Sequence, residues 1–314
     1  MRNHFTIENL RRAFRNPKLI RREVHRLLSL PLNKAYGYHV DQHTSSVDVM
    51  SKDWDNLFIL DACRADYFES QHCFEESAER VITPGKMSWE FMRETFLGKQ
   101  FHDTIYITSN PFATRLPEDT FFKTKYLIDE WDDEIGTIHP EDVVAAAVTA
   151  HERYPHKRLI LHFMQPHRPY LGPTAKRLRE RVDLKGYRNQ GDGLQIWGAA
   201  KEKKVTMEEV RQAYQESLDI VLDVVKSALD DIDGKTIITA DHGEMLGERV
   251  FPFTSRVWGH SEGFSTLTLR EVPWLELPSD SRRAVTESDP VEATEEIDTK
   301  KVSKRLSALG AVFR

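Results

Sequence analysis

Four short apolar runs, each bounded by charged or polar residues, recur along the chain. They cover residues 56–61, 104–108, 158–162 and 235–241. Runs of this length are typical of interior strands of a parallel sheet, where both faces of each strand are buried. Apolar residues at helical spacing lie around 141–152 and 206–230, after the second and third of these runs. The alternation of strands and helices predicts a layered α/β fold.

The most regular helical pattern begins at Thr206. Thr206 and Glu209 have the spacing of a capping box, in which each side chain binds the other residue's backbone N–H. One apolar face then follows, made of Val210, Tyr214, Leu218, Val221, Leu222, Val225 and Leu229. We therefore expect a long helix that packs this face against the sheet.

Residues 1–35 combine loosely helical apolar spacing with strong positive charge. The segment holds nine Lys or Arg and two Glu, whereas the whole chain has a net charge of −6. Breaks near Pro17 and at Leu30–Leu32 predict two short amphipathic helices. We weigh two roles: the segment rests on an anionic membrane surface, or it packs as a peripheral arm on the acidic remainder of the chain, which the pattern favours.

Composition places the chain among ordinary globular proteins and narrows its partners. It has 314 residues, of which 39% are hydrophobic and 30% charged. No stretch approaches the roughly 18 apolar residues that cross a bilayer, no signal-peptide core is apparent, and Cys63 and Cys73 have no metal-binding spacing. We therefore expect a cytoplasmic protein, and the acidic balance argues against a nucleic-acid partner.

Composition also divides the chain into three parts. The expected organisation is a basic helical arm over 1–50, an α/β catalytic domain over 51–279, and an acidic tether with a C-terminal helix over 280–314. Within the second part, the polar and basic stretch 173–205 is predicted to be a mobile surface segment. It either guides an anionic substrate or is only a solvated loop.

Three of the apolar runs end in acids or imidazoles. Asp61 closes the first, His162 closes the third, and Asp241 with His242 closes the fourth. In an open α/β sheet the ligand crevice lies outside the carboxyl ends of the strands, so residues distant in sequence converge there. Adjacent oxygen and nitrogen donors can bind one divalent ion. The spacing predicts one composite site, although Asp61 and the Asp241–His242 pair could instead cap the helices that follow.

Further imidazoles lie near glycine or arginine. His260 follows Gly259, and Gln165-Pro-His167-Arg168-Pro-Tyr170 comes shortly after His162. Neutral imidazole binds metal ions, while protonated imidazole and guanidinium bind anionic oxygens. His260 is thus a candidate metal ligand, and His162 or His167 is expected to contact a ligand or substrate.

The ordered set of motifs resembles the alkaline phosphatase superfamily, in particular its sulfatase-like branch. The motifs are Leu60-Asp-Ala-Cys-Arg-Ala-Asp66, Thr83-Pro-Gly85, Gln165-Pro-His-Arg-Pro-Tyr170, Asp241-His-Gly-Glu-Met-Leu-Gly247 and Gly259-His260, within residues 52–276. The resemblance implies a three-layer α/β/α sandwich with a mostly parallel central sheet. It also implies a divalent metal ion held by Asp61, Asp241 and His242, with His260 on the same or a second ion. Imidazole ligands favour zinc or manganese, and an all-oxygen site would favour calcium or magnesium.

The same resemblance implies a hydroxyl nucleophile at a helix start. Ser88 lies where relatives carry it, with Thr83 as the reserve, and either could instead be a helix cap. His167, together with Arg64 or Arg168, would offset charge on the oxygens of the substrate. The expected substrate is an anionic phosphate or sulfate ester, on a sugar or a lipid.

Departures from the family pattern limit this expectation. The signature Cys-x-Pro-x-Arg, which supplies formylglycine in sulfatases, is absent, which weakens sulfate-ester hydrolysis. A complete second metal site of the two-metal phosphatase kind is not expected, because Ser227 stands where a His would follow Asp223 by four residues. The sequence thus predicts a metal-dependent hydrolase or transferase. A non-catalytic binding protein of the same fold and a membrane-surface protein that uses its basic arm are the alternatives.

Overall fold

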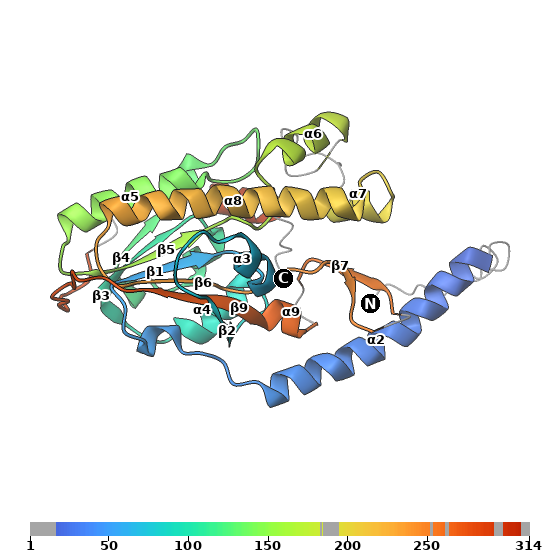
Figure 1. The fold of residues 1–314 in the computed structure, drawn as a ribbon, viewed down its shortest axis with the longest axis horizontal. Coiled ribbons are helices and arrows are strands. Elements are labelled where there is room, and N and C mark those ends of the chain that lie inside the picture. The colour runs from blue at the N-terminus through green and yellow to red at the C-terminus, as the bar shows by residue number, and fades with distance from the viewer. Residues whose placement is uncertain are drawn as a thin grey trace.

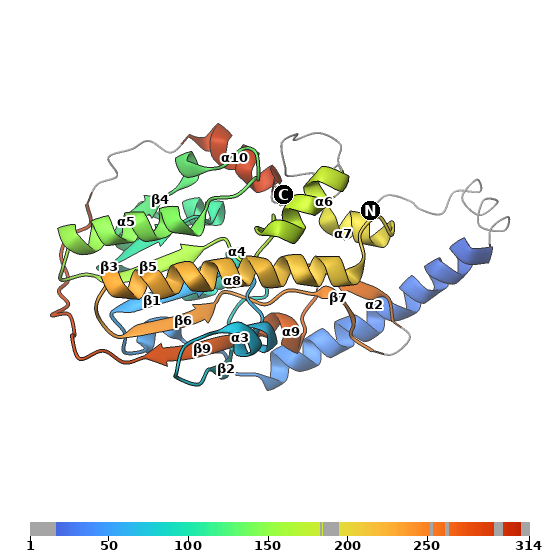
Figure 2. The same cartoon turned by 45° about the horizontal axis from the view of Figure 1, so that its top comes forward.

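A seven-stranded mixed sheet forms the centre of the molecule. The computed structural model describes residues 17–182, 184, 195–251, 254–260, 264–291 and 298–308. The strand order is β2-β9-β6-β1-β5-β3-β4, shown in Figures 1 and 2. Their bounds, in chain order, are β1 Asn56–Leu60, β2 Glu79–Ile82, β3 Phe101–Thr108, β4 Phe121–Tyr126, β5 Arg158–Phe163, β6 Thr236–Ala240 and β9 Glu271–Leu277.

The four strands expected from apolar runs are neighbours in this sheet. β6, β1, β5 and β3 are adjacent and parallel, and β4 continues the parallel part. β9 runs antiparallel to β6, and β2 runs antiparallel to β9. The predicted α/β fold with a mostly parallel central sheet is therefore confirmed, and the antiparallel edge adds strands that the apolar pattern did not reveal.

Helices cover both faces of the sheet. Successive side chains of a strand point to opposite faces, so a continuous apolar strand gives each face apolar residues to bury. Phe58 and Leu60 of β1 belong to one apolar cluster, with buried residues of α5 (Pro140–Arg153) and α8 (Met207–Asp231). Leu57 and Ile59 belong to another, which includes Phe91 and Met92 of α4 (Ser88–Thr95). The sheet is the middle of three layers.

The predicted capping box begins α8. Thr206 Oγ1 accepts a hydrogen bond from the backbone N–H of Glu209 at 3.1 Å, and the carboxylate of Glu209 accepts one from the N–H of Thr206 at 2.8 Å. The predicted apolar face is buried over most of its length, including Val210, Tyr214 and Leu218. α8 therefore provides a rigid cover for the sheet and for the site at its edge.

The N-terminal segment differs from its prediction. α2 (Pro17–His43) is a single helix that contains Pro31, so the predicted helix end at Leu30–Leu32 is wrong. Proline removes one backbone hydrogen bond of a helix without preventing its continuation. Contacts beyond Pro31, among them the close approach of Gly37 to Ser265, hold the helix against the body. Residues 1–16 lie outside the described part of the chain.

The polar segment 173–205 also differs from its prediction. It contains α6 (Pro173–Arg181) and α7 (Ile196–Lys201), whose buried Leu178 and Trp197 share an apolar cluster with α8. The prediction of a mobile surface segment is therefore wrong for 173–182 and 195–205, and residues 183 and 185–194 lie outside the described residues. A few apolar side chains suffice because both helices pack on the N-terminal part of the apolar face of α8, at Val210 and Tyr214.

Shorter elements complete the described chain. They are α3 (Ala65–Gln71), the hairpin of β7 (Leu246–Arg249) and β8 (Arg256–Trp258), α9 (Leu267–Arg270), α10 (Thr299–Ala308) and the 3-10 turns η1 (Val49–Ser51), η2 (Pro111–Arg115), η3 (Glu118–Thr120) and η4 (Ile128–Glu130). α10 matches the predicted C-terminal helix and buries Val302 and Leu306 beside Ile128. Among the helices described, none combines the length and the apolar character needed to cross a membrane.

Candidate active site

The carboxyl ends of β1 and β6 bring the predicted metal ligands together. These strands are parallel neighbours. Leu60, which precedes Asp61, pairs with Ala240, which precedes Asp241. One ligand atom each from Asp61, Asp241 and His242 lies within 4.8 Å of the others. All three side chains are buried. The sheet register thus joins residues that are about 180 positions apart in sequence.

Hydrogen bonds orient Asp241 and His242. Asp241 Oδ1 accepts from the backbone N–H groups of Ala62 at 3.0 Å and His242 at 2.8 Å. His242 Nδ1 lies 2.8 Å from the carbonyl oxygen of Gly243. Because a carbonyl only accepts, Nδ1 carries the proton and Nε2 presents its lone pair. A side chain at Gly243 would come within 2.0 Å of the Thr268 carbonyl oxygen, so glycine is required in this turn.

Asp61 receives two side-chain donors on one oxygen. Asp61 Oδ2 accepts from Ser88 Oγ at 3.1 Å and from Asn110 Nδ2 at 2.7 Å. Burial, and then repulsion by Asp241, raise the pKa of Asp61 well above its ordinary value. Burial would also raise the pKa of Asp241, but the neighbouring His242 and His162 outweigh it and lower that pKa. Two carboxylates so close together require compensating positive charge.

Several buried polar atoms of this group have no hydrogen-bond partner. They are Asp61 Oδ1, Asp241 Oδ2 and His162 Nε2, and the last two lie 3.6 Å apart. Burying carboxylate oxygens without a partner is costly, and a cation removes that cost. Oxygen and imidazole donors suit zinc or manganese. The residues therefore fit a divalent metal ion.

Ser88 is the first residue of α4 and adjoins the carboxylate group. Its Oγ lies 3.1 Å from Asp61 Oδ2 and 3.3 Å from His242 Nε2. A side chain at Gly85 would come within 2.4 Å of the backbone nitrogen of Phe91, so the turn before α4 requires glycine. Thr83, the reserve nucleophile, instead donates its hydroxyl to the carbonyl oxygen of Asp241 at 2.7 Å. Of the two hydroxyls, only that of Ser88 contacts the proposed ligands through side-chain atoms.

A second group lies beside the first. One ligand atom each from His167, Glu244 and His260 lies within 4.8 Å of the others, and the rings of His242 and His260 are 4.3 Å apart. Glu244 Oε2 and His167 Nδ1 are buried without a hydrogen-bond partner. Burial, and then the nearby Arg168, lower the pKa of His167 well below its ordinary value, so its imidazole is neutral. The structure places His260 with His167 rather than within the Asp61 group.

Two residues of the site were missed from the sequence. Asn110 lies two residues after the end of β3, much as Asp61 lies directly after β1. Because ligand sites lie outside the carboxyl ends of parallel strands, this position could have indicated Asn110. Glu244 stands inside the Asp241–Gly247 motif but received no role. Both are buried, and only the packing shows which donors meet.

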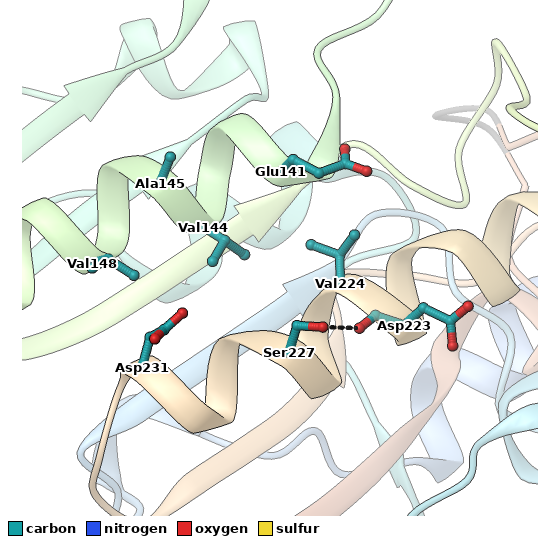
Figure 3. A pocket seen from close by; sticks show the side chains of 8 residues that line it. All are labelled: Glu141, Val144, Ala145, Val148, Asp223, Val224, Ser227 and Asp231. Atoms are coloured by element: carbon teal, nitrogen blue, oxygen red, sulfur yellow. Dashed lines mark hydrogen bonds between the residues drawn. The ribbon is translucent and has the colours of Figure 1, made fainter.

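The remaining predicted residues lie as follows. The guanidinium of Arg64 binds Asp66 at 2.7 Å and Glu248 at 2.6 Å, and its Nη1 donates to the carbonyl oxygen of Glu244 at 3.3 Å. Asp223 and Ser227 are exposed on α8 and line a surface groove of about 580 Å³. Figure 3 shows this groove between α5 and α8. The second group described above does not include them.

We expect Asn110→Leu to lower metal affinity about 10- to 100-fold, because it removes a donor that orients Asp61, and such supporting partners have effects of this size. Competition with a chelator measures the affinity. Asn56→Leu is the matched control, because Asn56 is a buried asparagine at the opposite end of β1 that binds Asp233 and Thr236. Equal affinities for wild type and Asn110→Leu would remove Asn110 from the site.

Solved structures that resemble this chain share little of its sequence. No protein-family model and no curated protein matches the sequence. Among solved structures, the C-terminal periplasmic domain of EptC from Escherichia coli, in complex with Zn, has 14% identity and a TM-score of 0.48, with 76% of each chain covered. Lipooligosaccharide phosphoethanolamine transferase A from Neisseria meningitidis, an integral membrane protein, has 11% identity and a TM-score of 0.43. That match covers 76% of this chain but only 49% of the transferase, about half its length.

A third structure extends the comparison. A protein in the alkaline phosphatase superfamily from Vibrio parahaemolyticus has 14% identity and a TM-score of 0.37, with 81% of this chain and 69% of that chain covered. At such identities the likeness concerns the fold alone. The chain is structurally similar to members of the alkaline phosphatase superfamily, among them phosphoethanolamine transferases.

Proposed function

We propose that this protein is a metal-dependent hydrolase or transferase that acts on a phosphate-containing ester through Ser88, with sulfate esters as the nearest variant. One observation carries the proposal. The Ser88 hydroxyl contacts Asp61 and His242 beside two buried carboxylate oxygens that have no hydrogen-bond partner. A nucleophile next to a cation-binding group is the arrangement that ester displacement at phosphorus requires.

Asp61, Asp241 and His242 would hold the metal ion, and zinc or manganese suits this donor set. When bound, a divalent cation would supply positive charge for phosphoryl oxygens and lower the pKa of a nearby hydroxyl. His242 contributes its Nε2 lone pair, because its Nδ1 proton is donated to Gly243. Asp241 keeps one oxygen for backbone donors and leaves the other available.

Ser88, at the start of α4, would attack phosphorus in line with the leaving oxygen. Its proton is donated to Asp61 Oδ2, which leaves lone pairs of Oγ available for phosphorus. The new bond joins Oγ to phosphorus while the bond from phosphorus to the leaving oxygen breaks. The Ser88 proton passes to Asp61, and the leaving oxygen takes a proton from solvent. In the second step the oxygen of water, or of a sugar or lipid hydroxyl, bonds to phosphorus while the bond from phosphorus to Oγ breaks. Ser88 recovers its proton from Asp61, and the attacking hydroxyl gives its proton to solvent.

The second group would contact the substrate beside Ser88. His167 is neutral and buried with an unpartnered Nδ1, so it can donate a hydrogen bond to an anionic oxygen or bind a second cation through a lone pair. Glu244 and His260 complete that group. Arg64 was expected to offset substrate charge directly. Because its guanidinium binds Asp66, Glu248 and the backbone of Glu244, we propose that it positions Glu244.

Metal analysis and a substrate panel test this function. Purified protein is stripped with a chelator, reloaded with zinc or manganese, and assayed on a phosphate monoester, a phosphodiester and a sulfate ester carrying the same nitrophenol group. We expect turnover of a phosphate ester by the loaded protein and none by the stripped protein. Metal binding without turnover of any ester would instead identify a non-catalytic binding protein, and failure to bind metal would overturn the proposal.

A further inference from the structure

The described part of α2 exposes large apolar side chains to water. The residues buried against the body are the polar Ser29 and Asn33, Gly37 and the apolar Val40. Leu32 and Tyr38, by contrast, are 52% and 69% exposed, more than any other large hydrophobic residue in the described chain. A surface helix of a globular protein normally buries its apolar stripe and exposes its polar one. The outward face of α2 therefore lacks the partner that its composition suits.

The inner face of α2 is already engaged by the protein. The backbone N–H of Ser255 donates to Ser29 Oγ at 3.1 Å, and an atom added at Gly37 would lie 3.1 Å from the backbone of Ser265. Asp41 binds Arg270 at 2.6 Å and accepts from Ser265 Oγ at 2.8 Å. These contacts fix which face points outward. Figures 1 and 2 show α2 on the outside of the molecule, with its N-terminal end beyond the sheet.

The exposed side of α2 includes further apolar positions, and the helix carries positive charge. Pro31, Ala35 and Tyr38 are exposed and follow one another at helical spacing. The range 17–43 has five Lys or Arg and two acids, and one of these acids, Asp41, is paired with Arg270. Residues 1–16 add four Arg and one Glu. Exposed apolar side chains on a helix with net positive charge are typical of a helix that lies in a membrane interface.

We propose that the outward face of α2 docks on the surface of an anionic lipid bilayer. Apolar side chains such as Leu32 and Tyr38 enter the interface, and the basic residues are attracted to anionic head groups. A bilayer suits this surface better than a protein or a nucleic acid does. Exposed apolar side chains beside positive charge can enter a lipid interface without a surface of matching shape. This inference does not depend on the enzymatic proposal.

Docking would also set the orientation of the site. Asp41 binds Arg270, Arg270 Nε donates to the carbonyl oxygen of Thr83 at 2.8 Å, and Thr83 Oγ1 donates to that of Asp241 at 2.7 Å. A continuous path of ionic and hydrogen-bonded contacts thus joins α2 to the Asp61 group. A helix held in the interface would keep that group at a constant orientation relative to the lipid.

Vesicle co-sedimentation of the full chain tests the proposal. We expect binding to phosphatidylglycerol vesicles that weakens as salt is raised, and little binding to phosphatidylcholine vesicles. The double variant Leu32→Ser/Tyr38→Ser should lower partitioning about tenfold or more, because it removes two apolar side chains from the interface. Lys34→Glu, a charge reversal at an exposed position of α2, should weaken binding to the anionic vesicles alone.

Leu97→Ser is the matched control, because Leu97 is 40% exposed on another part of the surface, and it should bind as wild type does. Circular dichroism of each variant checks that the fold is kept. Unchanged binding by the Leu32/Tyr38 variant, or equal binding to both lipids, would overturn the proposal. So would a concentration-dependent dimer, measured without lipid, that the same variant dissociates.

Discussion

Ser88→Ala is expected to reduce turnover of the phosphate ester by roughly 10⁶-fold, the scale seen when a catalytic nucleophile is removed. The loss follows because the Ser88 hydroxyl is the group that contacts both Asp61 and His242. Metal affinity should change little, since the carboxylate oxygens and the His242 nitrogen remain. The measurement is kcat on the best ester of the panel, with metal affinity determined in parallel.

Two comparisons separate chemistry from folding. Ser88→Thr keeps a hydroxyl and should recover part of the activity that alanine loses. Ser217→Ala removes a buried hydroxyl from α8, where it accepts from the backbone of Leu171, and should leave kcat near that of wild type. Rapid quenching of wild type should reveal a phosphoryl group on Ser88. Equal kcat values for wild type and Ser88→Ala would exclude Ser88 as nucleophile.

Asp241→Asn is expected to weaken metal binding strongly while the protein still folds. Asp241 Oδ1 accepts from two backbone N–H groups, and an asparagine oxygen can keep both bonds. Its amide nitrogen would replace Oδ2, the oxygen without a hydrogen-bond partner, and an amide N–H₂ cannot bind a cation. We therefore expect metal affinity to fall by about 100-fold or more, beyond the effect of a supporting residue.

Thermal unfolding provides the readout for Asp241→Asn. Free metal at 100 times its Kd should stabilise wild type by about 2.7 kcal/mol, and the variant should gain little at the same concentration. Without metal the two proteins should unfold at similar temperatures. Asp223→Asn, an exposed aspartate of α8, should behave as wild type. Metal-dependent stabilisation of Asp241→Asn equal to that of wild type would contradict the proposed ligand set.

Several features were predictable because they depend on local chemistry. The four apolar runs became adjacent parallel strands, since continuous apolar sequence of strand length is stable where both faces are covered. Thr206 and Glu209 formed their capping box, which needs only residues three positions apart. Asp61, Asp241 and His242 met because the carboxyl ends of neighbouring parallel strands share one edge of the sheet.

Other features required the whole fold. β2 and β9 pair antiparallel at one side of the sheet. β2 is an edge strand without an apolar run, and the apolar residues 272–275 of β9 do not by themselves show which strands they pair with. α2 continues past Pro31, and α6 and α7 pack on α8, because tertiary contacts outweigh local propensity. His260 joined Glu244 and His167, which come from three separate segments whose distances the linear pattern does not encode.

The amino-acid sequence by itself determined the α/β class, the four central strands, and the acids and imidazoles that follow them. These follow from periodicity and from the direction of parallel strands. Only the tertiary structure decided that Ser88 rather than Thr83 contacts Asp61, that Asn110 and Glu244 join the site, and that Leu32 and Tyr38 of α2 are exposed. The physical reason is that such contacts depend on sheet register and on packing between distant segments, which no local pattern specifies.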